Sequence, residues 1–298
     1  MSAVTSLRCP AKLNLGLEVV GVMPDGYHEI RTLFQAIDLA DDLAVELLGS
    51  ELLLEVDGSD VPRGSDNLVV RAASLLRETT GVKQGARIRL SKRVPVGAGL
   101  GGGSSNAAVT LLALDRLWET GLGLRGLSPL AVRLGADVPY FLHGGLCLGL
   151  GRGEKLFPVQ SDLSETLFVL VCPHQILSTA QVYADWDAQL TSGAKDSRLR
   201  RFLASALAGQ VEWGHLHNDL ERPATQRAEG ILEARSALAE TGAHAVLMSG
   251  SGPAVFGVFL EQQQAEDAER SLSAAGHRTY LCRTLSRAKY VEFIGFQG

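Results

Sequence analysis

The spacing of hydrophobic residues along the 298-residue chain predicts strands and helices in mixed order. Apolar runs at 13–20, 43–48 and 52–56 are typical of strands, and the pattern at about 67–78 is typical of a helix. We predict the later elements, in order, as a buried strand at 167–171, helices near 201–207 and 224–238, strands at 245–248 and 255–260, a helix at about 265–275 and a strand at 278–283. This irregular order predicts an α+β fold rather than a doubly wound parallel sheet.

The character of the chain changes after Gly151-Arg152-Gly153, which predicts a domain boundary near residue 155. A chain of this length can bury one large core or two smaller ones, and two is the better expectation. We therefore expect domains at 1–155 and 156–298, with a polar, weakly ordered stretch at 192–198 in the second.

A glycine-rich stretch at 95–106, Pro-Val-Gly-Ala-Gly-Leu-Gly-Gly-Gly-Ser-Ser-Asn, separates a predicted strand at 87–93 from a predicted helix at 106–118. Its five glycines let the backbone adopt unusual conformations and approach a ligand closely. Unpaired N–H groups and the positive end of the helix dipole would point into such a loop. The pattern therefore predicts an anion site whose natural ligand is a polyphosphate.

This loop matches neither of the two common nucleotide-binding fingerprints. A Walker A loop requires a lysine after its last glycine, but here Ser104 follows Gly103. Gly97, Gly99 and Gly102 fit the Gly-x-Gly-x-x-Gly spacing, but almost any triplet does so among so many glycines. The structural alternative is a long flexible turn, although a turn rarely needs more than two glycines or ends in a Ser-Ser pair at a helix start.

Two charged residues are candidates for chemistry. A short helix ending at Gly135, capped by Ser128 with Pro129 at its first position, would place Asp137 in a loop just beyond it. Lys12 stands beside an apolar run near the N-terminus. A lone lysine is usually solvated, and an aspartate after a helix is often a turn residue, so the pattern alone leaves both assignments open.

Composition narrows the class of protein. A hydrophobic content of 46% with 20% charged residues is ordinary for a globular protein, and a net charge of −5 argues against nucleic acid or an anionic membrane as the main partner. The cysteines, at 9, 147, 172 and 282, are scattered, which favours buried reduced thiols in a cytoplasmic protein. No apolar run approaches a membrane span or a signal peptide.

Four blocks of the sequence resemble the GHMP kinases, the family named for galactokinase, homoserine kinase, mevalonate kinase and phosphomevalonate kinase. The first block consists of two N-terminal segments, PAKLNLGL (10–17) and DGYHEIRT (25–32). The other three are the glycine-rich loop, GADVPYFL (135–142) and SGSGPAVF (249–256). The third consecutive glycine and the Asp-Gly-Tyr-His-Glu run resemble one branch. That branch phosphorylates a methylerythritol carrying a diphosphocytidyl group, in the non-mevalonate route to isoprenoid precursors.

The resemblance implies a two-domain GHMP kinase fold. Its N-terminal domain would be of the ribosomal protein S5 domain 2 type and its C-terminal domain ferredoxin-like, with the site between them. ATP would be the co-substrate and Mg²⁺ is expected with it. The catalytic residues fall on Lys12 and Asp137: Asp137 would take the hydroxyl proton, and Lys12 would hold Asp137 ionised and stabilise charge on the transferred group.

The resemblance also implies binding residues. The substrate-binding set is Asn14, Tyr27, His28 and Tyr183, in which two aromatic rings would stack on the cytosine. A further loop would close the far side of the phosphate site, at Ser249, Gly250, Ser251 and Gly252. The ATP-binding set is Pro95, Val96, Gly97, Ala98, Gly99, Leu100, Gly101, Gly102, Gly103, Ser104 and Ser105.

Other points stay open in the sequence. Ser104 or Ser105 could bind the metal, but no glutamate is an obvious partner, and ATP phosphates and water could hold most of it. His215 and His217 are interpreted as structural, because a metal site would need a third ligand. The alternatives are a kinase of the homoserine or mevalonate type and a catalytically inactive nucleotide-binding regulator. The expected partners are small molecules, and the expected state is a monomer or weak homodimer.

Overall fold

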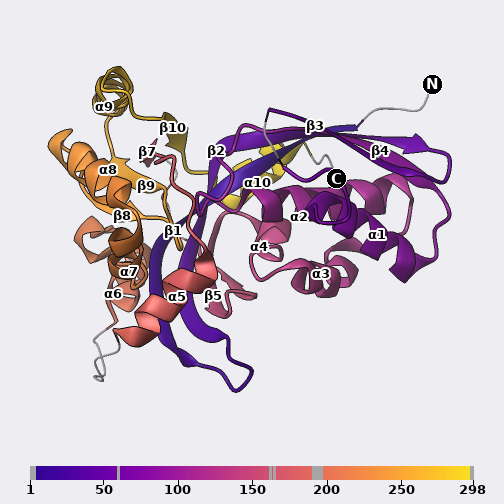
Figure 1. The fold of residues 1–298 in the computed structure, drawn as a ribbon, viewed down its shortest axis with the longest axis horizontal. Coiled ribbons are helices and arrows are strands. Elements are labelled where there is room, and N and C mark those ends of the chain that lie inside the picture. Colours follow the sequence, from indigo (N-terminus) through magenta and orange to yellow (C-terminus); the bar gives the residue numbers. More distant parts are fainter. Residues whose placement is uncertain (1–4, 59–60, 161–162, 164–165, 190–196, 296–298) are drawn as a thin grey trace.

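Two sheets, each covered by helices, make up the computed structural model, which describes residues 5–58, 61–160, 163, 166–189 and 197–295 (Figure 1). Strands and helices are mixed, so the predicted α+β fold is confirmed. Among these residues no helix is both long and apolar enough to cross a membrane.

The first sheet is built around a long antiparallel pair, β1 (Thr5–Val22) and β2 (His28–Leu48). One half of β2 pairs with β4 (Gly85–Ser91) and the other half with β5 (Leu146–Gly151). The edges are β3 (Leu52–Asp57), which is parallel to β4, and β6 (Lys155–Pro158). The register of β1 on β2 shifts between Pro10 and Ala11 and again between Asn14 and Gly16, so irregular pairing flanks Lys12 on both sides.

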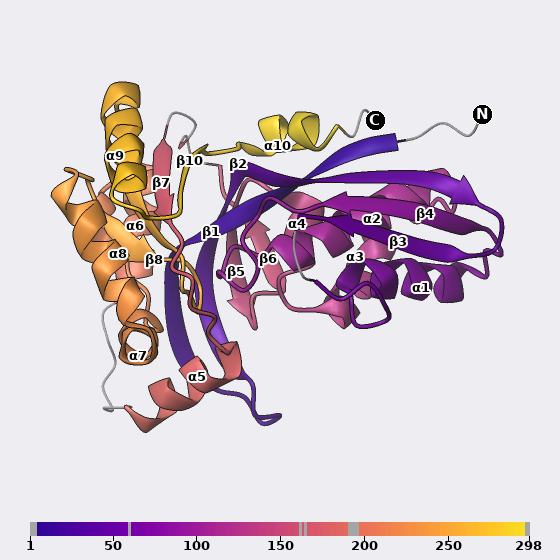
Figure 2. The same ribbon diagram turned by 45° about the horizontal axis from the view of Figure 1, so that its top comes forward.

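Four helices cover one face of this sheet (Figures 1 and 2). They are α1 (Leu68–Thr80), α2 (Gly102–Leu117), α3 (Gly123–Leu134) and α4 (Tyr140–His143). Helix α2 is buried along most of its length between the sheet and its neighbours α1 and α3, because its small and apolar residues allow close packing on all sides.

The second sheet has the order β10-β7-β9-β8 and is antiparallel throughout. Its strands are β7 (Leu167–Val171), β8 (Val246–Met248), β9 (Val255–Phe259) and β10 (Thr279–Arg283). The remaining helices of this half are α5 (Thr179–Ala188), α6 (Arg198–Leu207), a 3₁₀ turn at Trp213–His215, α7 (Glu221–Arg227), α8 (Glu229–Glu240) and α9 (Gln262–Ala274).

One apolar cluster joins the two halves. Leu13 and Leu15 of β1 pack in it with Phe168 of β7 and Phe256 of β9. The last helix, α10 (Arg287–Ile294), also links the halves, because it leaves the second sheet and packs beside β1 (Figure 2). The two-domain division at residue 155 stays a prediction: it falls at the start of β6, which still belongs to the first sheet, and α10 returns to that sheet.

Several predicted elements are confirmed, among them α1 with Asn67 as its cap and the strand at 167–171. Some predicted helix boundaries were wrong. Helix α3 begins at Gly123, so Ser128 and Pro129 lie inside it, and the helix predicted at 224–238 is two helices, α7 and α8. The stretch at 192–198 lies outside the described residues up to 196.

Candidate active site

The glycine-rich loop ends in helix α2, which begins at Gly102 rather than at the predicted Asn106. The loop before it turns through positive φ at Gly97, Gly99 and Gly101, where φ is 69°, 78° and 72°. A side chain on Gly101 would also meet Phe141, since a Cβ there would lie 2.7 Å from the Phe141 Cζ. Glycine is therefore required at these turns by the backbone itself.

The start of α2 offers free N–H groups to an anion. Its cap residue is Gly101, which has no side chain to accept hydrogen bonds from the first N–H groups of the helix. The first intrahelical bond runs from Ser105 N to Gly101 O. The N–H groups of 102–104 precede that bond, and a helix of 16 residues adds its dipole at the same end. This geometry fits the predicted phosphate site.

Lys12 and Asp137 meet beside this loop. Lys12 Nζ lies 3.7 Å from Asp137 Oδ2, 2.9 Å from the carbonyl oxygen of Gly99 and 2.5 Å from Asn14 Oδ1. The Lys12 side chain is 4% exposed and that of Asp137 36%, so the carboxylate is open to a ligand while the ammonium is enclosed. Burial lowers the pKa of Lys12, and the nearby Asp137 carboxylate opposes that shift.

A cavity of about 1000 Å³ opens over this pair and is large enough for an extended ligand. It lies between the two halves of the chain. Its lining includes the sequence-predicted residues Lys12, Asn14, Tyr27, His28, Gly97, Gly99, Gly101, Ser104, Asp137, Tyr183, Gly250, Ser251 and Gly252.

The far end of this cavity is aromatic. The His28 ring stacks on Tyr183 of α5, with ring centroids 4.5 Å apart, and His28 Nε2 lies 2.8 Å from Asp187 Oδ1. Tyr27 is 57% exposed, and the Arg152 guanidinium lies 3.6 Å from its ring centroid. The structure thus brings the three predicted aromatic residues to one end, although His28, rather than a ligand, occupies one face of Tyr183.

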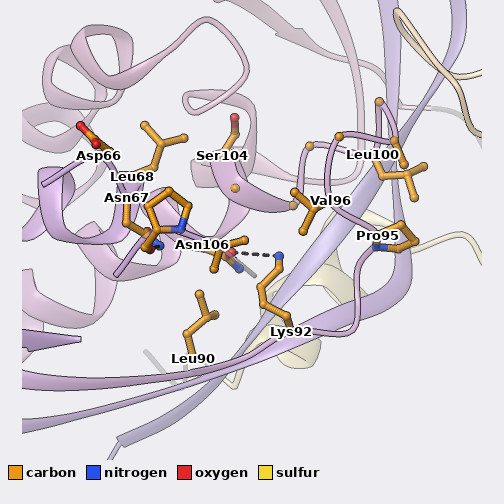
Figure 3. Close-up of a pocket in the computed structure, with 18 residues that line it drawn as sticks. Asp66, Asn67, Leu68, Leu90, Lys92, Pro95, Val96, Leu100, Ser104 and Asn106 are labelled. Carbon is orange, nitrogen blue, oxygen red and sulfur yellow. Dashed lines mark hydrogen bonds between the residues drawn. The ribbon is translucent and has the colours of Figure 1, made fainter. Parts of the chain in front are cut away.

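A second cavity, of about 300 Å³, is also lined by the glycine-rich loop (Figure 3). It is lined by Asn67 and Leu68 from the start of α1, by Lys92, and by the loop itself. Four loop residues line both cavities: Gly97, Gly99, Gly101 and Ser104. The other predicted loop residues on the small cavity do not line the larger one: Pro95, Val96, Ala98, Leu100, Gly102 and Gly103.

A buried carboxylate holds the base of the loop in place. Asp41 is fully buried and accepts hydrogen bonds from Lys92, from the N–H groups of Arg93 and Val94, at 2.7 and 2.8 Å, and from Asn106 Nδ2, at 2.9 Å. Figure 3 shows Lys92 pointing toward Asn106, whose Oδ1 lies 3.2 Å from the ammonium. These bonds tie the strand that enters the loop to the helix that leaves it.

The loop at 249–252 lies against the glycine-rich loop. Ser249 is fully buried, and its hydroxyl donates to the Gly99 carbonyl at 3.1 Å while accepting from Asn14 N at 3.3 Å. Ala254 N donates to Ala98 O at 3.1 Å. The predicted far wall of the phosphate site is therefore in contact with both Lys12's strand and the loop.

Some sequence-predicted residues lie away from the cavities. Ser105 and Ser249 are buried and line neither cavity. His215 lies 2.7 Å from Glu212 and His217 lies 2.8 Å from Asp219, which supports structural roles for both. No cluster of three or more His, Cys, Asp or Glu side chains suited to a metal occurs among the residues that the structure describes.

Sequence reasoning missed several residues that line the site. Arg133 and Arg152 line the large cavity, and Asn67, Leu68 and Lys92 line the small one. Only Arg152 carried a local signal, its place between two glycines in Gly151-Arg152-Gly153.

Two family models match this chain: the GHMP kinases N terminal domain at residues 67–145 and the GHMP kinases C terminal domain at 200–278. The first match contains the glycine-rich loop and Asp137. The chain therefore belongs to the GHMP kinase family.

Within that family the chain belongs to the 4-diphosphocytidyl-2-C-methyl-D-erythritol kinases. A relative of that name from Pelotomaculum thermopropionicum is 40% identical, covering 93% of this chain and 96% of its own length. Another from Alkaliphilus metalliredigens is 38% identical, covering 96% and 98%. A crystal structure of 4-(cytidine 5'-diphospho)-2C-methyl-D-erythritol kinase superposes with a TM-score of 0.79 at 38% identity, covering 94% of this chain and 99% of the other.

Proposed function

We propose that this chain transfers the terminal phosphoryl group of ATP to the 2-hydroxyl of 4-diphosphocytidyl-2-C-methyl-D-erythritol. The observation that carries the proposal is the position of the Lys12–Asp137 pair. The pair lines a single cavity. One end of this cavity is a helix N-terminus suited to phosphates, and the other end is aromatic and suited to a base. The 38–40% identity over nearly the whole chain to kinases of that name supports the same substrate.

The two cavities suggest how the ligands share the site. ATP phosphates would lie on the N–H groups at the start of α2, since that is the anion site of the loop. The base of ATP would then enter the smaller cavity, beside Asn67 and Lys92. The larger cavity would hold the acceptor alcohol, with its cytosine near Tyr27, His28 and Tyr183.

The charges of the larger cavity suggest a partner for the diphosphate of the acceptor. Lys12 pairs with Asp137 and Arg152 with Asp25, so each of these cations already has a carboxylate partner. Arg133 also lines the cavity, at the last turn of α3, and within the described part of the chain it has neither an ion pair nor a hydrogen bond. An arginine suits phosphate oxygens because its planar donors match their geometry. We propose that Arg133 binds the diphosphate.

In the proposed reaction Asp137 accepts the proton of the 2-hydroxyl as that oxygen attacks the terminal phosphorus. Asp137 is the carboxylate of the central pair that faces the cavity, so its oxygen can reach a ligand hydroxyl. Lys12 would stabilise charge on the transferred group, because its ammonium is enclosed and already fixed by Gly99 O and Asn14. A fixed donor of this kind needs no reorganisation during the transfer.

Mg²⁺ would accompany ATP and neutralise charge on its phosphates. The residues that face the phosphate site fit a metal held mainly by ATP and water. Ser104 lines both cavities at the start of α2 and offers one hydroxyl, whereas the described residues contain no carboxylate cluster there. Ser105 is the weaker candidate because its buried side chain lines neither cavity.

We also propose that the chain works in the cytoplasm as a monomer or weak homodimer. All four cysteines are free and buried, which suits a reducing compartment. Analytical ultracentrifugation at several protein concentrations tests the oligomeric state.

The decisive experiment is an ADP-release assay that offers the cytidylyl substrate, homoserine and mevalonate in parallel. We expect turnover with the cytidylyl substrate alone. Turnover of homoserine or mevalonate instead would assign a different alcohol kinase, and ATP binding without turnover of any alcohol would support the inactive regulator. Structures titled as homoserine and mevalonate kinases share the fold at only 19% and 14% identity.

A further inference from the structure

A three-residue segment, His217–Asp219, attaches the second half of the chain to the strand that carries Lys12. Leu17 N donates to His217 O at 2.8 Å, and Asp219 N donates back to Leu17 O at 2.9 Å. Val19 N donates to Asp219 Oδ2 at 2.8 Å. The segment therefore runs beside β1, a few residues beyond Asn14, as a short parallel bridge.

Asn218 is the middle residue of this segment, and its side chain is turned toward the loop at 249–252. It is buried, and its Nδ2 donates to Met248 O at 2.8 Å and to Gly250 O at 2.7 Å, while its Oδ1 accepts from Leu220 N at 3.0 Å. Reversing the amide would set its oxygen against two carbonyl oxygens, so the network permits one orientation. Asn218 thus binds the carbonyl oxygens of the two residues on either side of Ser249.

Ser249 continues this chain of contacts to the catalytic ammonium. Its hydroxyl donates to Gly99 O, the same carbonyl oxygen that accepts from Lys12 Nζ. A Cβ placed on Gly250 would lie 3.4 Å from Lys12 Nζ, so the loop backbone itself closely approaches the ammonium. The position of the 249–252 loop therefore sets the position of an acceptor that fixes Lys12.

We propose that Asn218 is a positioning residue for phosphoryl transfer, acting through Ser249 and the Gly99 carbonyl to hold Lys12 beside Asp137. This inference rests on the proposed function, since it assumes that Lys12 acts on the transferred group. Asn218 touches no cavity that would hold a reactant. Asn218 would affect the rate only through the position of Lys12, and a displacement of about 1 Å in an active site can lower the rate about 100-fold.

Two variants interrupt the proposed connection at different points. Asn218→Asp keeps the size of the side chain and removes both N–H donors to the loop. Ser249→Ala removes one hydroxyl and leaves the fold of the loop, so it decides the question even if Asn218→Asp does not fold. His217→Ala is the matched control, because its ring points to Asp219 and only its backbone joins β1.

Each variant is assayed below its own Tm, with kcat measured across pH and KM for ATP and for the alcohol. We expect kcat to fall about 10- to 100-fold in Asn218→Asp and Ser249→Ala, and to stay within twofold of wild type in His217→Ala. The alkaline limb of kcat should move to higher pH in Asn218→Asp and in Ser249→Ala, because a looser loop admits water and relieves the burial that lowers the pKa of Lys12. The double variant should lose no more than the stronger single variant.

Folded Asn218→Asp or Ser249→Ala protein with wild-type kcat and an unmoved alkaline limb overturns the inference, as does a double variant whose losses multiply. A lower Tm with unchanged kcat would assign Asn218 to stability alone and would also overturn it. The proposed function fails separately: it fails if wild type does not phosphorylate the cytidylyl alcohol. In that case kcat of each variant is compared with kcat of wild type on the alcohol that wild type does phosphorylate. Equal kcat values would still overturn the proposed role of Asn218.

Discussion

Gly103 offers a direct test of why the loop is so rich in glycine. Unlike Gly101, it has an ordinary helical backbone in the first turn of α2. A Cβ there would meet only Leu68, at 3.6 Å, which is normal van der Waals contact. The folded chain therefore has no need of glycine at this position, yet Gly103 lines the smaller cavity. We infer that a bound phosphate needs the space.

The Gly103→Ala change should act in opposite directions on stability and on ATP affinity. Alanine in a helix is favoured over glycine by up to about 1 kcal/mol, so the ligand-free protein should be as stable as wild type or more so. A methyl group forced into a packed phosphate site costs about 1–3 kcal/mol, which corresponds to about a 5- to 150-fold rise in Kd. Gly101→Ala should instead lose stability, because its φ of 72° and the contact with Phe141 both oppose a side chain.

Calorimetric titration with a non-hydrolysable ATP analogue gives the affinity, and thermal unfolding without ligand gives the stability. At a ligand concentration 100 times the wild-type Kd, binding should stabilise wild type by about 2.7 kcal/mol and a 100-fold weaker variant by about 0.4 kcal/mol. Wild-type affinity in Gly103→Ala would refute the close approach of phosphate to α2. A destabilised ligand-free Gly103→Ala would refute the claim that only the ligand requires this glycine.

Four further outcomes are expected from single changes and from pH. Asp137→Asn should lower kcat about 10²- to 10⁴-fold with ATP affinity retained, and wild-type turnover in the folded variant would identify another base. Because burial lowers the pKa of Lys12, the lysine loses its charge as pH rises through a value below the ordinary 10.5. We therefore expect kcat to fall with rising pH before pH 10.5 is reached. A kcat that stays constant up to pH 10.5 would contradict the role of Lys12 in phosphoryl transfer. Tyr27→Ala should raise KM for the cytidylyl substrate and leave KM for ATP unchanged, whereas the reverse result would place Tyr27 in the ATP site. Arg133→Gln should raise KM for the same substrate about fivefold at low salt, since an exposed ion pair contributes about 1 kcal/mol, with Arg125→Gln on the same helix as a control that should show no change.

Local patterns in the sequence predicted those parts of the fold that local forces decide. The apolar run at 167–171 is a strand buried on both faces, and Asn67 caps α1 because its side chain accepts from Val69 N. The glycine-rich loop could be assigned to an anion because only a ligand or an unusual backbone explains so many glycines. For the strand and the helix cap, residue type and order along the chain were enough to make the prediction.

The boundaries that failed were decided by packing. Helix α3 passes through Pro129 because Leu127, Leu130 and Leu134 form a buried stripe that holds the helix across the missing N–H. Helix α2 begins at Gly102, a residue packed so closely that a Cβ there would lie 3.0 Å from Val94 Cγ1. Propensity alone placed both starts too late.

The site could be predicted only where motifs carried it. Lys12 and Asp137 came from the resemblance, and the structure places them 3.7 Å apart. The stack of His28 on Tyr183 and the bond from Asn218 to Gly250 join residues far apart in sequence, at positions that no periodicity marks. Such contacts depend on the placement of two sheets, which local hydrophobic patterns do not encode.

The return of α10 to the first sheet has a consequence for the order in which the chain folds during synthesis. Leu7 of β1 and Ile294 of α10 belong to the same apolar cluster, and Tyr290 fills the space beside Gly144. The part of that cluster under α10 closes only after the ribosome has released residue 294, whereas the second sheet is complete at Arg283. Domains generally fold in the order of translation. Here the half that is made first is finished last, so the apolar patch that α10 covers stays exposed to chaperones until synthesis is nearly complete.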